Sequence, residues 1–237
     1  KANDDKLREI EEQMQFIVLR IPNMMHSSVP VGASADDNVE VRSTAQRIPQ
    51  EFRKNHLEIA KQLGILDFER GAKVSGSGFG FYTGKGATLE RAMINMFLDL
   101  HIAQHGYTEM MPPFVVNRAS MLGTGQIPKM EDDMYHCTVD DLFLIPTAEV
   151  PLTNYYRDDV LNEKDLPTKF AGYSACFRRE GGSYGKDTRG FLRVHEFNKV
   201  ELVKFVKPET SYNELELLVA DVEDILRALE LPFRVLQ

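Results

Sequence analysis

The feature that most constrains the fold of this chain is a pair of strand-like runs within residues 170–205, joined by a glycine-rich and basic loop. The segment reads FAGYSACFRREGGSYGKDTRGFLRVHEFNKVELVKF. Because side chains alternate between the two faces of a strand, Arg178 and Glu180 are expected on one face of the first run. In the second run, intervals of four put a further set on one face: Arg193, Phe197 and Glu201. The other face is predicted to enter a core and holds Leu192, Val194, Val200 and Leu202. A hairpin of the two runs would align the charged faces.

The aligned faces carry chemistry that suits a nucleotide. Arginines are planar cations for phosphate or carboxylate oxygens, an aromatic ring can stack on a base, and carboxylates can bind an amine. The connecting loop, residues 181–190, contains four glycines together with Lys186 and Arg189, so it could approach a polyphosphate closely. The same spacing also fits the solvated, charged face of an ordinary antiparallel sheet. Spacing alone leaves both interpretations open.

Three segments resemble the signature motifs of class II aminoacyl-tRNA synthetases, in the variant of the seryl-tRNA synthetases. The second class II motif is similar to FRREGGSYGKDTRGFLRVHEF, and the first motif, a long helix leading to a strand that ends in proline, is similar to GATLERAMINMFLDLHIAQHGYTEMMPP. The serine-recognition tripeptide of that family resembles Thr147-Ala148-Glu149, which follows the apolar run LFLIP. The resemblance begins near the N-terminus, at IPNMMHSSVPVG, and extends to Gln237.

The resemblance implies an α+β fold, a class II antiparallel β-sheet flanked by helices and preceded by the end of a helical coiled-coil arm. It implies ATP-dependent activation of L-serine to seryl-adenylate and transfer of the seryl group to tRNA(Ser). ATP and Mg²⁺ are the implied cofactors, and L-serine, tRNA(Ser) and a second copy of the chain in a homodimer are the implied partners. No covalent enzyme intermediate is needed, so positioning and charge neutralisation should carry the catalysis.

The resemblance also implies nucleotide contacts, residue by residue. Arg178 should bridge the serine carboxylate and the α-phosphate, and Arg193, with Arg189, should hold the outer phosphates; Arg178 and Arg193 are the expected catalytic residues. Glu180 should accept a hydrogen bond from the adenine amino group, and Phe197 should stack under adenine. The implied ATP-binding set is Arg178, Arg179, Glu180, Arg189, Arg193, Val194 (through its backbone) and Phe197.

The implied serine pocket consists of Thr147, Ala148, Glu149, Arg178 and Glu201. Its threonine and its two carboxylates should bind the substrate's amine and hydroxyl. Ordinary alternatives exist for these side chains, because Thr147 could cap a helix entered through residues 148–150, and Glu149 or Glu201 could be surface carboxylates.

Composition indicates one globular core and argues against several classes of protein. The chain has 237 residues, 43% of them hydrophobic and 27% charged, which is ample for one core. Its apolar runs are short and its N-terminus, KANDDKLREIEEQ, is highly charged, so neither a signal peptide nor a membrane-spanning helix is expected, and a cytoplasmic location follows. The net charge of −8 argues against a general nucleic-acid coat. Cys137 and Cys176 are too few for a disulfide framework and are predicted to be reduced.

The N-terminal segment predicts a helix with a heptad seam. The seam, ended by Pro22, consists of Leu7, Ile10, Met14, Ile17 and Ile21. It could be the end of a longer coiled coil or an amphipathic helix docked on the domain, and the resemblance favours the former. We therefore expect residues 1–21 to end a tRNA-binding arm, residues 22–40 to form a linker, and residues 41–237 to form a class II catalytic domain.

Two further helices are predicted, over residues 54–63 and 88–105, with stops at Gly64 and Gly106. Between them, VSGSGFGFYTGKG superficially suggests a phosphate-binding loop, but it lacks the required Ser or Thr after Gly84-Lys85 and is predicted to be a sheet edge and turn. His101 and His105 have the spacing of a zinc pair without an evident third ligand, so no metal site is predicted.

The C-terminal part predicts a helix with a capping box at Ser211 and Glu214, followed by a strand over residues 233–237. The order of elements lacks regular β-α-β alternation, which favours an antiparallel sheet backed by helices. The third class II motif, with its phosphate-binding arginine and metal-binding carboxylate, is not seen before Gln237. Two alternatives therefore stay open: a non-catalytic or fragmentary binding module of this fold, and an amino acid:carrier-protein ligase.

Overall fold

The centre of the fold is a three-stranded sheet with the strand order β4-β8-β9. The computed structural model describes residues 2–44, 54–181 and 191–237. β8 (Thr168–Phe177) and β9 (Glu196–Phe205) are antiparallel along their whole length, so the predicted hairpin is confirmed. β4 (Thr108–Met110) joins β8 in parallel orientation, and the expectation of a purely antiparallel sheet is wrong at this edge. The two strands begin at the same end of the sheet, where Lys169 donates a hydrogen bond to the carbonyl of His105 at 3.0 Å.

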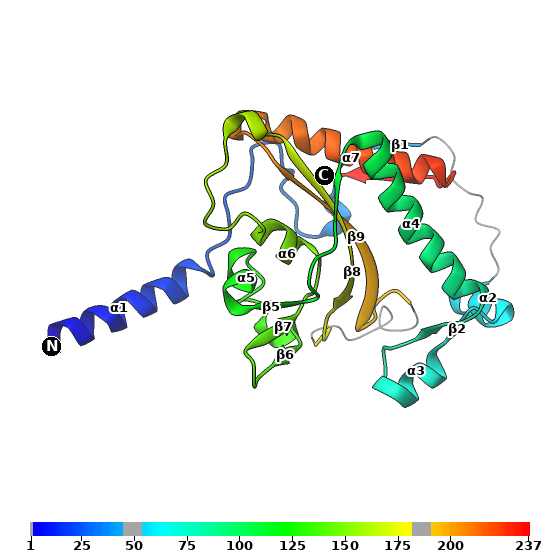
Figure 1. Cartoon of the computed structure of the whole chain (residues 1–237), viewed down its shortest axis with the longest axis horizontal. Helices are drawn as coiled ribbons and strands as arrows, with labels where there is room; N and C mark the ends of the chain where they lie inside the picture. The colour runs from blue at the N-terminus through cyan, green and yellow to red at the C-terminus, as the bar shows by residue number, and fades with distance from the viewer. Residues whose placement is uncertain (1, 45–53, 182–190) are drawn as a thin grey trace.

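The other elements surround this sheet, and together they make an α+β fold (Figure 1). The helices are α1 (Ala2–Val18), α2 (His56–Leu63), α3 (Phe68–Ser75), α4 (Lys85–His105), α5 (Arg118–Gly123), α6 (Glu149–Asn154) and α7 (Ser211–Ala228). The short strands are β1 (Glu40–Ser43), β2 (Leu66–Asp67), β3 (Phe81–Tyr82), β5 (Val115–Asn117), β6 (His136–Cys137), β7 (Leu142–Leu144) and β10 (Arg234–Leu236). They pair as β1 with β10, β2 with β3, and β5-β7-β6.

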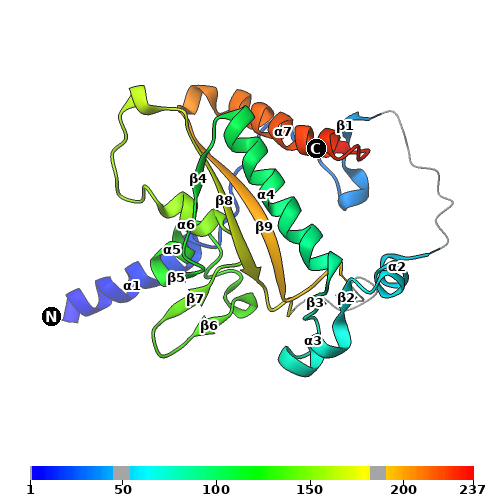
Figure 2. The ribbon, with the colours of Figure 1, turned by 45° about the vertical axis from the view of Figure 1, so that its right-hand side comes forward.

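One face of the central sheet packs against α4, with α7 beside that helix (Figure 2). The buried residues there are Leu98, Tyr107 and Ala171, and Val200 and Leu202 of β9 pack against them as predicted. Leu192 is 69% exposed, so its predicted place in the core is wrong. The reason is local: β9 begins only at Glu196, and the alternation that assigned Leu192 to the core does not operate before it.

The opposite face of the sheet is covered by α6, next to α5 and the β5-β7-β6 sheet (Figures 1 and 2). A second core lies in this part of the fold and consists of Val116, Met121, Ile127, Met134, Phe143, Ile145 and Val150. Phe143, Ile145 and Val150 have no exposed surface. The segment between β7 and α6 is therefore held rigidly, and it carries the predicted Thr147-Ala148-Glu149 tripeptide.

The predicted helix stops are confirmed and one predicted start is wrong. Gly64 and Gly106 end α2 and α4 in the left-handed conformation, at φ 63° and 69°. α4 begins at Lys85 instead of residue 88. Its first turn contains Gly86, where a Cβ would collide with the carbonyl oxygen of Ile65, so this glycine serves close packing inside the helix.

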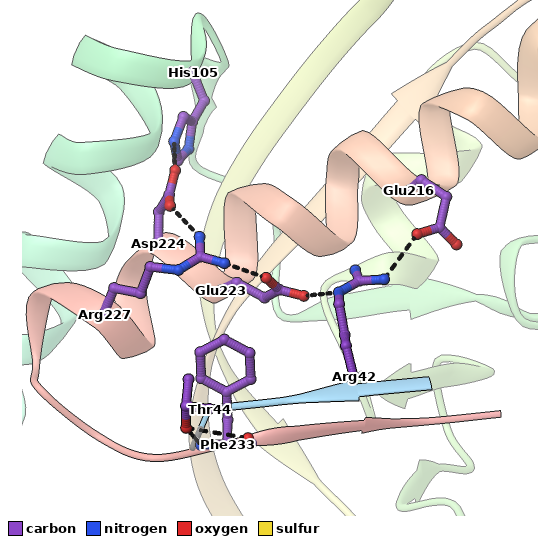
Figure 3. A network of polar contacts seen from close by, with 8 residues as sticks. All are labelled: Arg42, Thr44, His105, Glu216, Glu223, Asp224, Arg227 and Phe233. Atoms are coloured by element: carbon purple, nitrogen blue, oxygen red, sulfur yellow. Dashed lines mark hydrogen bonds and ion pairs between the residues drawn. The ribbon is translucent and has the colours of Figure 1, made fainter. Parts of the chain in front are cut away.

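α7 is tied to the β1-β10 ribbon by a chain of ion pairs (Figure 3). Glu223, a buried carboxylate, accepts from Arg42 of β1 at 2.6 Å and also pairs with Arg227. Arg227 reaches Asp224 at 2.6 Å, and Asp224 in turn contacts Nε2 of His105 in α4 at 3.2 Å. Segments from the two ends of the chain are thereby fastened to α7.

The predicted capping box at the start of α7 does not form. The residue before the helix is Thr210, whose side chain makes no capping hydrogen bond, and a short 3-10 turn (Pro208–Thr210) leads directly into the helix. Glu214 instead pairs with Lys204 of β9 at 3.2 Å. A buried cation has recruited the carboxylate that local sequence assigned to the helix start.

α1 projects away from the remainder of the fold (Figure 1). Its predicted seam is exposed along its whole length, from Leu7 to Ile21. The helix is confirmed, while its membership of a coiled coil stays a prediction. Among the described helices, none combines the length and apolar character needed to cross a membrane.

Candidate active site

The face of the sheet opposite α4 is lined by small side chains on β8 and larger functional ones on β9. In the antiparallel register, Gly172 lies opposite Glu201, Ser174 opposite Lys199, and Cys176 opposite Phe197. Paired residues point to the same side of the sheet, so these six share one face. The small residues of β8 leave room above the sheet for the three side chains of β9.

Thr147 connects this face to α6. Its hydroxyl donates a hydrogen bond to Oε2 of Glu201 at 2.6 Å and accepts one from the backbone N–H of Glu149 at 3.1 Å. Nζ of Lys199 lies 2.7 Å from the Thr147 hydroxyl and 2.6 Å from Glu201 Oε2. The structure thus brings together Thr147 and Glu201, as expected of one pocket, and the capping alternative for Thr147 is realised by the same hydroxyl.

Glu149 lies at the start of α6, directly after the buried Ala148. Although the Glu149 side chain reaches solvent, partial burial raises the pKa of its carboxyl group, and the nearby Glu201 carboxylate raises it further. The Lys199 ammonium acts in the opposite direction. Two carboxylates and one ammonium therefore influence one another across the pocket.

Arg178 stands between this pocket and Phe197. Its guanidinium lies 5.0 Å from the centre of the Phe197 ring, and its Nε donates to the carbonyl of Pro146, beside Thr147, at 3.3 Å. The backbone N–H of Arg178 donates to the carbonyl of His195 at 2.9 Å. A cation is thus placed next to an aromatic ring on one side and the threonine segment on the other.

The predicted alternation of Arg178 and Glu180 along a strand is wrong. β8 ends at Phe177, and Glu180 has a positive φ of 51°, so both residues lie in the turn that follows the strand. Glu180 and Arg193 nevertheless meet across the hairpin, in an ion pair of 2.8 Å. The sequence predicted the neighbourhood of these charges correctly and their backbone incorrectly.

The remaining predicted residues have varied positions. Val194 is buried, as predicted for its side chain, and Arg179 is exposed, with its backbone N–H donating to the carbonyl of Asp133 at 2.9 Å. Arg193 lies before β9 and is exposed. Arg189 lies outside the described residues.

Sequence reasoning missed three contributors to the site. Lys199 was one, although it lies two residues from both Phe197 and Glu201 and alternation alone places it on their face. His195 accepts from and donates to the hairpin around Arg178, with 3.0 Å between its Nδ1 and the Arg178 carbonyl. Asp133 accepts from the backbone N–H of Gly181 at 2.9 Å.

The glycine-rich segment that suggested a phosphate loop supports His195 instead. Gly78 has a φ of 84°, and its carbonyl accepts from the His195 N–H at 3.0 Å. A Cβ at Gly78 would collide with the His195 ring, and the neighbouring Phe79 ring stacks on that ring at 5.2 Å. The edge-and-turn prediction is confirmed by the pairing of β3 with β2.

Comparison with known proteins places the chain among tRNA synthetases. The family model described as "tRNA synthetase class II core domain (G, H, P, S and T)" matches residues 130–237. The chain is 60% identical over 236 residues to the Serine--tRNA ligase of Chloroherpeton thalassium, a match that covers 98% of this chain and 55% of that protein.

Two solved structures are similar along nearly the whole chain. The seryl-tRNA synthetase from Pyrococcus horikoshii complexed with ATP has a TM-score of 0.89 at 34% identity, covering 98% of this chain and 57% of that one. The cytoplasmic Serine-tRNA ligase from Naegleria fowleri in complex with AMP has a TM-score of 0.86 at 30% identity, covering 100% and 57%. The chain therefore spans a little more than half the length of these proteins.

Proposed function

Because the chain belongs to the seryl-tRNA synthetase family of class II synthetases, we propose that it activates L-serine with ATP and transfers the seryl group to tRNA(Ser). In the first step, a serine carboxylate oxygen attacks the α-phosphorus of ATP, and the bond to the bridging oxygen breaks to release pyrophosphate. In the second step, the terminal ribose hydroxyl of the tRNA displaces AMP from the seryl carbonyl. Both steps need aligned reactants and stabilised negative charge.

The observation that carries the proposal is the position of Arg178 between Phe197 and the Thr147–Glu201 pair. A cation placed there can contact the serine carboxylate and the α-phosphate together, which is where the new bond forms. Phe197 offers a ring face for adenine, and Glu201 offers a carboxylate for the serine ammonium group. We assign Glu149 and the backbone of Ala148 to the same serine pocket.

The triphosphate would lie toward the hairpin turn. We assign Arg193, Arg179 and Arg189 to its phosphates, and Glu180 to the adenine amino group. Since Arg193 and Glu180 form an ion pair at 2.8 Å, nucleotide binding would exchange this contact for phosphate and adenine contacts. In the part of the chain that the structure describes, no group of three His, Cys, Asp or Glu side chains could hold a metal ion, so these residues do not fit a protein-bound Mg²⁺. The implied Mg²⁺ stays a prediction.

Serine should be preferred over alanine, which lacks only the hydroxyl group. We expect the seryl sulfamoyl-adenylate to bind the full chain about tenfold to a hundredfold more tightly than the alanyl analogue, because pocket groups that serve the hydroxyl would be left unpaired. Isothermal titration calorimetry with the two analogues measures the difference. Equal affinities would contradict the serine assignment.

A homodimer is proposed on the surface formed by α4 and β4. A groove of about 460 Å³ lies there, lined in part by Ile94, Met110 and Tyr173. Next to it, Met111 is 93% exposed, an unusual position for a large apolar side chain. A second copy would cover this surface through a self-complementary two-fold interface.

Light scattering at micromolar concentration should therefore give the mass of a dimer, and Met111→Glu should shift the equilibrium toward monomer by placing a charge in the interface. Met24→Glu is the matched control, since Met24 is 92% exposed and lies in the segment after α1. A monomeric wild-type chain would contradict the dimer.

The tRNA-binding arm and the domain limits are proposals as well. α1 exposes Leu7, Ile10, Met14 and Ile17 as a continuous stripe, as expected of one strand of a coiled coil. This stripe favours a synthetase over an amino acid:carrier-protein ligase. We keep residues 1–21 as the end of the arm, 22–40 as linker and 41–237 as catalytic domain, and a cytoplasmic location stays a prediction.

A further inference from the structure

We propose that the Lys199 ammonium group occupies, in the unliganded protein, the position that the serine ammonium group takes on binding, so that the substrate enters by displacing it. The inference rests on the proposed function, because it concerns the same serine pocket. It assigns to Lys199 the role of a positioning and selecting residue that holds the pocket in a cation-ready state. The observations that carry it are the hydrogen bonds of the Thr147 hydroxyl.

The Thr147 hydroxyl has no hydrogen-bonding capacity left over. A hydroxyl can donate one hydrogen bond and accept two. The Thr147 hydroxyl donates to Glu201 at 2.6 Å, and it accepts from the Glu149 backbone at 3.1 Å and from Lys199 Nζ at 2.7 Å. A substrate group can therefore contact this oxygen only if one of the three partners leaves.

Lys199 is the partner that can leave. The Glu149 N–H belongs to the backbone at the start of α6, which is anchored by the buried Ala148 and Val150. The Lys199 ammonium group lies at the end of a flexible four-carbon chain, and 33% of its side chain is exposed. Its cross-strand neighbour is Ser174, a small residue that leaves space beside the lysine stem.

The ammonium group of Lys199 also has the contacts that a substrate ammonium group would need. It lies 2.6 Å from the Glu201 carboxylate and 2.7 Å from the Thr147 hydroxyl, one ionic and one neutral acceptor. Two ammonium groups cannot share these acceptors at such distances without repulsion. Serine binding is then an exchange of one cation for another, and a free amine gains little from it unless its other groups find contacts in the pocket.

The test is the affinity of the full chain for two amines after Lys199→Met, which keeps the length of the side chain and removes its charge. Ethanolamine serves as a probe of the ammonium position, because it has the amine and hydroxyl of serine without the carboxylate that Arg178 would bind. We expect calorimetry to show both serine and ethanolamine binding about tenfold more tightly to this variant, since one charge-assisted hydrogen bond no longer has to be broken. Lys73→Met, on the exposed side of α3, is the matched control and should leave both affinities unchanged.

Lys199→Gln provides a second variant in case the methionine leaves Glu201 too destabilised for folding. It should also bind ethanolamine more tightly than the wild type does, because a neutral amide is displaced from a carboxylate more easily than an ammonium group. Weaker or unchanged binding by folded variants, while the wild type binds serine, would overturn the exchange and leave the proposed function intact. A wild type that binds neither serine nor the seryl sulfamoyl-adenylate would instead remove the proposed function, and the inference with it.

Discussion

Replacing Arg178 with alanine is expected to lower the rate of serine-dependent pyrophosphate exchange by about a hundredfold to a thousandfold, the loss typical of removing one donor that stabilises charge in a transition state. Arg178 is placed 5.0 Å from the Phe197 ring and 3.3 Å from the Pro146 carbonyl, so its guanidinium spans the junction between the two substrates. Negative charge on the transferred phosphate is shared between them as the new bond forms. The loss should therefore appear in kcat more than in the KM for either substrate.

Arg234→Ala is the matched control for this experiment. Arg234 is exposed on β10, which pairs with β1 at the far side of α7 from the hairpin turn (Figures 1 and 2). The control should retain the wild-type rate. If Arg178→Ala also exchanged pyrophosphate at the wild-type rate, Arg178 would not contact the reacting groups and the central assignment of the site would be wrong.

The sequence predicted those parts of the fold where a local rule decides the outcome. The β8-β9 hairpin follows from alternation, and the ends of α2 and α4 follow from Gly64 and Gly106, which adopt the left-handed conformation that glycine favours. Alternation failed for Leu192 and Glu180 because the backbone there is not extended. A period can be read only where a strand exists, and its limits are set by contacts elsewhere in the fold.

Long-range contacts explain most of the differences between prediction and structure. β1 and β10 come from the two ends of the chain, and no pattern in either segment announces their pairing. The first turn of α4 depends on the close approach of Ile65 to Gly86, which only the folded chain reveals. Likewise Glu214 follows a capping pattern but binds Lys204, because a buried cation needs a partner more than a helix end needs a cap.

The candidate site was predicted better than the backbone that carries it. Thr147 and Glu201 are separated by 54 residues and meet at 2.6 Å, which the resemblance implied and spacing could not. Lys199 could have been predicted from alternation and was missed because a lysine between two assigned residues looked like an ordinary surface charge. Its contacts with both pocket groups change the interpretation of the pocket in its unliganded state.

Lys204→Met is expected to lower the free energy of unfolding by about 3–5 kcal/mol, the usual cost of removing one partner from a buried ion pair. Only 4% of the Lys204 side chain is exposed, and its ammonium lies 3.2 Å from Glu214 and 3.6 Å from Asp221, both on α7. Asp221 also accepts from the hydroxyl of Tyr107 at 2.8 Å. Without the lysine, two carboxylates would face each other in the contact between α7 and the sheet, with no cation between them.

Urea unfolding of the full chain at neutral pH measures this loss as a lower midpoint with an unchanged slope. Lys207→Met is the control, since Lys207 pairs with Glu163 at the surface, where an ion pair contributes less than about 1 kcal/mol. A combined Lys204→Met, Glu214→Gln and Asp221→Asn variant should recover part of the loss, because the uncompensated charges are then gone. If Lys204→Met and Lys207→Met cost the same, the attachment of α7 to the sheet would depend on apolar packing, and the buried cation would have no special part in it.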